Sequence, residues 1–280
     1  MTRILCLHGL GTNAEILKSQ IAPVVSVLPQ HFEWFFPDAE IECDPAPGVE
    51  LWPGPYRTYF VIPTTKQMKH MMDWLGEIIE DEGPFDGVLG FSEGGALAYT
   101  AMMHHQETSS DGIPLFRFAI FISCALPWTW DESTGIDVTA LVIRGRDVPV
   151  ELPELQAAIE AIDKEANFDS KSWLTSTAIS PALRERVAAV PKEPNNYENY
   201  HVRRMHPDYD TVRLQAPTAH VLGRVDFAYE GGKKLRALCE PGYSQTWEHP
   251  GGHAIPRNGI DVLKIKEIIE RTVSRSEFGL

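Results

Sequence analysis

The sequence GPFDGVLGFSEGGALAYTAMMHH, from Gly83 to His105, joins a short apolar run to a segment of helix-forming composition. The run has the length of a buried strand, and the segment after it predicts a helix. Ser92 stands between them with glycine at positions 90 and 94. In this G-x-S-x-G pattern a sharp strand-to-helix turn holds a nucleophilic serine in a strained conformation, and a side chain at either glycine would collide with the backbone. The alternative is an ordinary connection in which Ser92 caps the helix, so the rest of the chain has to decide.

Composition limits what the rest of the chain can be. With 280 residues, 43% hydrophobic and 23% charged, it can bury the core of one large α/β domain. The net charge of -14 argues against nucleic acid or an anionic membrane as a partner. The start of the chain lacks a signal-peptide pattern, and no apolar run approaches the roughly 18 residues of a membrane span. Four cysteines without C-x-x-C spacing predict free thiols, so we expect a cytoplasmic location.

Strand and helix patterns alternate along most of the chain. Strands are predicted over residues 3–7, 32–36, 87–91, 116–123, 219–225 and 244–249, and helices over 14–28, 66–82, 94–105, 229–238 and 259–274. This order predicts a single α/β domain over residues 1–280, with about six mainly parallel strands flanked by helices. The regularity stops after Pro127, so residues 128–215 are interpreted as an inserted lid or cap that contains a helix over 152–165.

A nucleophilic serine needs a general base, and the base needs a carboxylate that fixes its tautomer. Asp226 follows one predicted strand, and His253 lies in the loop after the next. In a parallel sheet such groups gather at the carboxyl ends of the strands. The chain order Ser92, Asp226, His253 is that of an α/β-hydrolase, so we interpret these residues as a catalytic triad.

Asp147 is a second candidate for the acid. It ends the run TALVIRGRDVP, which resembles the run before Asp226. The next predicted strand after Asp147 carries only His220 within it and no histidine in a loop directly after it. The order of residues therefore favours Asp226.

Two further parts of the site can be expected. Backbone N–H groups of Leu10, in the glycine-rich HGLGTN turn, and of Glu93 are placed to form an oxyanion hole. Trp128 and Trp130 follow the strand over 116–123, so we expect them near Ser92, lining an apolar substrate site. The alternative for both indoles is core packing.

Several of these motifs together resemble a known family. LCLHGLGTN, GPYRTYF, GPFDGVLGFSEGGALA, AHVLGRVD and HPGGHAIP look like the fungal and yeast "family of serine hydrolases" within the α/β-hydrolases. The resemblance implies esterase or thioesterase activity with Ser92, Asp226 and His253 as the triad. It also implies a place in fungal polyketide metabolism, where relatives hydrolyse the thioester that holds a product on an acyl carrier protein.

We therefore expect a serine hydrolase whose partner is a small-molecule acyl ester or thioester, with no cofactor and no metal. The histidine pairs 104/105 and 201/206 lack the helical spacing and supporting acid of a zinc site. A non-hydrolytic acyltransferase, cyclase or binding module of the same fold remains the alternative. The sequence leaves the acyl group, the leaving group and the oligomeric state open.

Overall fold

The computed structural model describes residues 1–61, 63–138 and 201–277. The predicted helix over 152–165, the alternative acid Asp147 and most of the predicted lid lie outside the described residues.

A six-stranded parallel sheet forms the centre of the molecule, with strand order β11-β10-β6-β5-β1-β2. Its strands are β1 (Thr2–Leu7), β2 (Phe32–Phe35), β5 (Gly87–Phe91), β6 (Phe118–Ile122), β10 (Thr218–Gly223) and β11 (Ser244–His249). Each coincides with a predicted strand. The four inner strands are mainly apolar, whereas the edge strands β2 and β11 are half-buried and carry polar residues. The predicted sheet is therefore confirmed.

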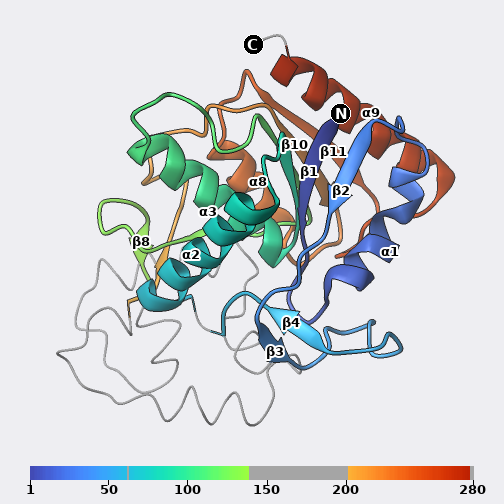
Figure 1. Ribbon diagram of the computed structural model, residues 1–280, viewed down its shortest axis with the longest axis horizontal. Helices are drawn as coiled ribbons and strands as arrows, with labels where there is room; N and C mark the ends of the chain where they lie inside the picture. The colour runs from blue at the N-terminus through green and yellow to red at the C-terminus, as the bar shows by residue number, and fades with distance from the viewer. Residues whose placement is uncertain (62, 139–200, 278–280) are drawn as a thin grey trace.

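Helices cover both faces of this sheet (Figure 1). One face carries α1 (Ala14–Val25) and α9 (Gly259–Glu277), and the other carries α2 (Thr65–Glu82), α3 (Glu93–Thr108) and α8 (Tyr229–Ala237). Alternate strand residues point to opposite faces, so Ile4 and Cys6 belong to the α1/α9 core while Leu5 and Leu7 belong to the other. None of the helices in the described part of the chain has the length and apolar character to cross a membrane.

Two small sheets were not predicted. β3 (Ile41–Cys43) pairs with β4 (Tyr56–Thr58), while β9 (Arg203–Arg204) pairs with both β7 (Trp128–Thr129) and β8 (Ile136–Asp137). Strands of two or three residues are too short to show an alternating pattern. The β3/β4 sheet matters for the site, because the backbone of Arg57 pairs with that of Thr12 and Gly11 and so holds the turn after β1.

Candidate active site

The turn between β5 and α3 has the strained geometry that the sequence predicts. Ser92 has φ 54° and ψ -116°, a backbone conformation that residues other than glycine rarely adopt. A β-carbon at Gly90 would overlap the backbone of Gly95, and one at Gly94 would overlap the carbonyl of Leu7. The Ser92 side chain makes no capping hydrogen bond to α3. The geometry therefore favours a serine held for chemistry over a serine that caps a helix.

The structure brings Ser92, His253 and Asp226 together. His253 Nε2 lies 2.9 Å from Ser92 Oγ, and His253 Nδ1 lies 2.9 Å from Asp226 Oδ1. Asp226 comes from the loop after β10, and His253 comes from the loop after the neighbouring strand β11. The two hydrogen bonds thus connect residues from three separate loops at the carboxyl edge of the sheet.

The surroundings of Asp226 favour its ionised form. Its side chain is 1% exposed, and burial acts to raise the pKa. The hydrogen bond and charge of His253, together with the N–H of Ala228 at 2.7 Å, more than offset this burial, so the pKa lies below its usual value. An ionised carboxylate only accepts hydrogen bonds, so Nδ1 of His253 carries the proton and donates it. The Nε2 atom is then an acceptor for the hydroxyl of Ser92.

Two phenylalanines flank the imidazole of His253. The ring centroids of Phe91 and Phe227 lie 5.2 Å and 4.3 Å from that of the histidine. Phe91 is buried, whereas Phe227 is 69% exposed. An exposed aromatic ring against a base at the surface is a natural contact for an apolar group of a substrate. Phe227 was not identified from the sequence, although its position directly after Asp226 was a signal that could have indicated it.

Of the two predicted oxyanion-hole residues, Glu93 follows the serine directly, and Leu10 follows Gly9, which lies against the serine. Within the described residues, the N–H groups of Leu10 and Glu93 have no hydrogen-bond partner, and Glu93 is the first residue of α3. The loop that carries Leu10 touches the turn, because a β-carbon at Gly9 would lie 3.3 Å from that of Ser92. The hydroxyl of Thr12 donates to the carbonyl of Gly9 at 2.7 Å and fixes this loop. These N–H groups are therefore free to bind a negatively charged oxygen.

Trp128 and Trp130 lie elsewhere, and the expectation that both stand near Ser92 needs correction. The carbonyl of Trp128 accepts the hydroxyl of Thr100 at 2.6 Å, and the ring of Trp130 packs 4.5 Å from that of His104. Residues 100 and 104 lie about 12 and 18 Å from Ser92 along α3. After Leu126 the chain turns back over this helix, where Trp128 is buried beneath the guanidinium of Arg204 at 4.4 Å. The alternative, core packing, describes Trp128 better.

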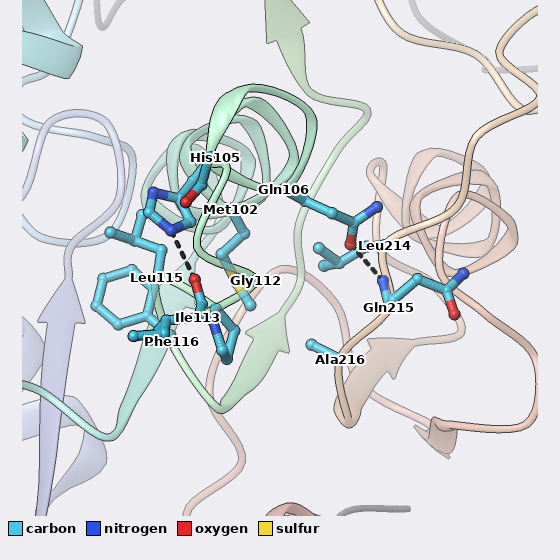
Figure 2. A pocket seen from close by; sticks show the side chains of 12 residues that line it. Met102, His105, Gln106, Gly112, Ile113, Leu115, Phe116, Leu214, Gln215 and Ala216 are labelled. Carbon is cyan, nitrogen blue, oxygen red and sulfur yellow. Dashed lines mark hydrogen bonds between the residues drawn. The ribbon is translucent and has the colours of Figure 1, made fainter.

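A cavity of about 210 Å³ lies well away from the serine. Figure 2 shows that it is lined by the last turns of α3, with Met102 and His105, and by the segments that lead into β6 and β10, with Ile113 and Gln215. These segments enter the amino ends of the strands, whereas Ser92 lies at the carboxyl edge. This cavity is therefore not part of the candidate active site.

Comparisons with known proteins agree with the fold. Residues 1–264 match the family described as serine hydrolase (FSH1). The chain is 30% identical to the esterase alnB of Emericella nidulans, over 99% of this chain and 98% of the relative. It is 29% identical to the hydrolase FUB4 of Gibberella moniliformis, over 97% and 98%. Among solved structures, the monoacylglycerol lipase of Paleococcus ferrophilus matches with a TM-score of 0.50 at 14% identity, over 97% of this chain and 94% of that one.

The fold is thus that of an α/β-hydrolase, and the enzyme is a serine hydrolase. Within that class, the chain belongs to the serine hydrolase (FSH1) family. The predicted family and enzyme class are confirmed.

Proposed function

We propose that this enzyme is an esterase or thioesterase that works through an acyl-enzyme on Ser92, with His253 as general base and Asp226 as the acid that orients it. The observation that carries the proposal is the pair of 2.9 Å hydrogen bonds that join Asp226, His253 and Ser92. A binding module of the same fold has no need of these three groups in contact, nor of a strained serine.

The reaction follows from this geometry. Nε2 of His253 takes the hydroxyl proton as Ser92 Oγ attacks the acyl carbon, and the N–H groups of Leu10 and Glu93 hold the negative oxygen of the tetrahedral intermediate. The imidazolium then gives its proton to the leaving alcohol or thiol, and the acyl group stays on Ser92. Water attacks this ester with His253 again as base, which releases the carboxylic acid and restores the serine. Asp226 stays ionised throughout.

For the substrate, we propose an acyl thioester or carboxylic ester of fungal secondary, polyketide metabolism, presented on an acyl carrier protein. Support comes from the family resemblance and from relatives in filamentous fungi that are named esterase and hydrolase. The exposed ring of Phe227 offers an apolar contact beside the base. We also propose that residues 1–280 form one cytoplasmic domain in which residues 128–215 are a lid region inserted between the adjacent strands β6 and β10.

A fluorophosphonate probe tests the mechanism, since it phosphonylates only an activated serine. We expect labelling at Ser92 that is lost in Ser92→Ala and strongly reduced in His253→Ala, with far-UV circular dichroism unchanged. Ser109→Ala, which replaces the serine that follows α3, is the matched control and should label normally. Labelling that persists in Ser92→Ala, or an active substrate from which no acyl-enzyme can be trapped, would exclude the mechanism.

The substrate class needs a matched series of acyl thioesters and p-nitrophenyl esters. Binding energy from a remote acyl chain can be used to position the carbonyl at Ser92, so kcat/KM should rise with chain length. Thioesters should exceed esters of the same acyl group, because their carbonyl is less stabilised by resonance. A flat or inverted profile would favour a small-ester esterase. Transfer of the acyl group to an added alcohol or amine in preference to water would favour the acyltransferase alternative.

A further inference from the structure

The side chain of Glu93, the residue after the nucleophile, has unusual surroundings for a carboxylate. It is partly buried, and Oε2 accepts the backbone N–H of Tyr59 at 3.1 Å. Thr58 Oγ1 lies 2.9 Å from Oε1 and 3.0 Å from Oε2. Both partners come from β4 and the residue that follows it, and both are almost fully buried. The carboxyl group thus ties the start of α3 to the small β3/β4 sheet.

Counting protons at this contact indicates which form of Glu93 fits. The hydroxyl of Thr58 has a single proton, yet it also lies 2.9 Å from the carbonyl oxygen of Phe60. Within the described part of the chain, that carbonyl has no other donor. If Glu93 is ionised, Thr58 can satisfy either the carbonyl or the carboxylate. If Glu93 is protonated, it donates to the hydroxyl of Thr58, which then donates to the carbonyl of Phe60. Each of these three groups then has a hydrogen-bond partner.

The neighbouring titratable groups supply no positive charge to a carboxylate here. Cys43 of β3 has its pKa raised to about 12, by burial first and by Glu93 second. Burial and the same carboxyl also raise the pKa of Tyr59 well above its usual value. The guanidinium of Arg57 pairs with Glu42, on β3, at 3.4 Å, and among the described residues Glu93 has no ion pair.

The titratable groups in the nearby loops, His8 and Asp38, are likewise neutral or negative. His8 accepts the N–H of Ala39 on Nε2 at 3.1 Å, and its burial lowers its pKa, so its ring is neutral. The nearby charge of Asp38 is negative and acts to raise the pKa of Tyr59. Burial raises the pKa of Glu93 itself to about 8, against the smaller lowering effects of its hydrogen bonds from Tyr59 and Thr58. This direction agrees with the proton count.

The contact also reaches the other half of the proposed oxyanion hole. The N–H of His8 donates to the hydroxyl of Tyr59 at 2.9 Å. His8 begins the loop that carries Leu10, while Glu93 supplies the second proposed N–H donor. Tyr59 therefore connects the two donors, bonding to one loop through its hydroxyl and to the Glu93 carboxyl through its backbone.

We propose that Glu93 is a positioning residue that works as a neutral carboxylic acid, holding the two oxyanion donors in place, and that its ionisation slows acyl transfer. The proposal rests on the proposed function. An ionised Glu93 puts a negative charge on the same residue whose N–H binds the developing oxyanion. It also breaks the series of hydrogen bonds from Glu93 through Thr58 to the carbonyl of Phe60. The acid is neutral below its pKa and charged above it, so kcat/KM should fall as the pH rises through about 8, on the order of tenfold in total.

Glu93→Gln separates the charge from the contacts. The amide oxygen of Gln can accept the Tyr59 N–H while the amide nitrogen donates to Thr58, which reproduces the neutral acid. We expect this variant to lose the alkaline fall and to have a higher kcat/KM at pH 7 than Glu93→Ala. Glu93→Ala loses the contacts and should be impaired at every pH. Glu107→Gln, which removes a charge from the last turn of the same helix, is the control and should keep the wild-type profile.

A direct measurement makes the test independent of turnover. The infrared difference between wild-type protein and Glu93→Gln should contain a carboxylic-acid carbonyl band at pH 7 that converts to carboxylate bands above pH 8. A carboxylate spectrum at pH 7, a Gln variant as impaired as the Ala variant, or a Gln variant that keeps the alkaline fall would each overturn the proposal. If Ser92→Ala keeps its activity, the serine mechanism fails instead, and the infrared titration still reports the state of Glu93.

Discussion

Replacing Asp226 with Asn removes one charge and leaves the shape of the side chain unchanged. Oδ1 of Asp226 accepts from both His253 Nδ1 and the N–H of Ala228, whereas Oδ2 has no hydrogen-bond partner in the described structure. The Asn side chain can therefore put its oxygen at the first position, keep both hydrogen bonds and preserve the tautomer of His253. What it loses is the charge that stabilises the imidazolium.

The size of this loss follows from the contact distance. With Nδ1 and Oδ1 2.9 Å apart, the centres of charge of the imidazolium and the carboxylate are about 4 Å apart. Their Coulomb attraction is then about 4 kcal/mol at an effective dielectric constant near 20. Each 1.4 kcal/mol corresponds to roughly a tenfold change in rate, so kcat should fall about 10³-fold. If the amide flips and its nitrogen faces the imidazole, the wrong tautomer forms and the loss approaches about 10⁴-fold.

The assay is kcat and KM on a p-nitrophenyl ester, with a urea titration of each variant to establish that it is folded. Asp210→Asn is the matched control, since Asp210 is also buried and accepts two backbone N–H groups, from His206 and Gly135, away from the serine. It should change stability without a comparable loss of kcat. Asp147→Asn should be mild. A loss of less than tenfold for Asp226→Asn, with a severe loss at Asp147, would refute the assignment of the acid.

Other variants test the turn at Ser92, the exposed ring of Phe227 and the stability at acidic pH. Gly94→Ala should abolish turnover and lower Tm because its β-carbon overlaps the backbone of β1, whereas Gly76→Ala, with open space around it, should not; equal behaviour would contradict this. Phe227→Ala should raise KM for apolar substrates more than it lowers kcat, and an unchanged KM would exclude a substrate contact. The pKa of Asp226 is lower in the folded protein than in the unfolded chain, so its ionised form stabilises the fold above the unfolded pKa, and this stability is lost as the pH falls through the folded pKa. As the pH is lowered to about 3, the urea midpoint of Asp226→Asn should therefore fall less steeply than that of the wild type. Parallel curves would rule this out.

The sequence predicts the central sheet because its inner strands are mainly apolar runs and the helices between the strands are long enough to show a helical period. It predicts the serine, aspartate and histidine for a related reason, since each lies within four positions of the end of a predicted strand. The helix expected over 14–28 ends at Val25, one of the boundary differences that local patterns do not resolve. The β3/β4 sheet escapes prediction because its strands are three residues long.

The error over Trp128 and Trp130 has a different cause. Their position was inferred from the strand that precedes them, but it is decided by a strand that follows much later. Trp128 and Thr129 pair with Arg204 and Arg203, and this pairing accompanies the return of the chain along α3. Pairing partners some 75 positions apart leave no local trace in the sequence. Glu93 is similar, because its contacts with Thr58 and Tyr59 depend on an element 34 and 35 positions away.

The register of the parallel strands explains why these distant residues meet at one point. Leu7 is opposite Gly90, Phe91 is opposite Ile122, and Gly223 is opposite His249. The strands therefore end at nearly the same level, and the functional groups follow closely: Ser92 comes directly after β5, Asp226 three positions after β10 and His253 four positions after β11. A shift of one residue in any pairing would move a loop by about 3.3 Å and turn its side chains to the other face of the sheet. Hydrogen bonds of 2.9 Å on both sides of His253 cannot survive such a shift. The apolar residues that set the register therefore determine the geometry of the site as strictly as the polar residues within it.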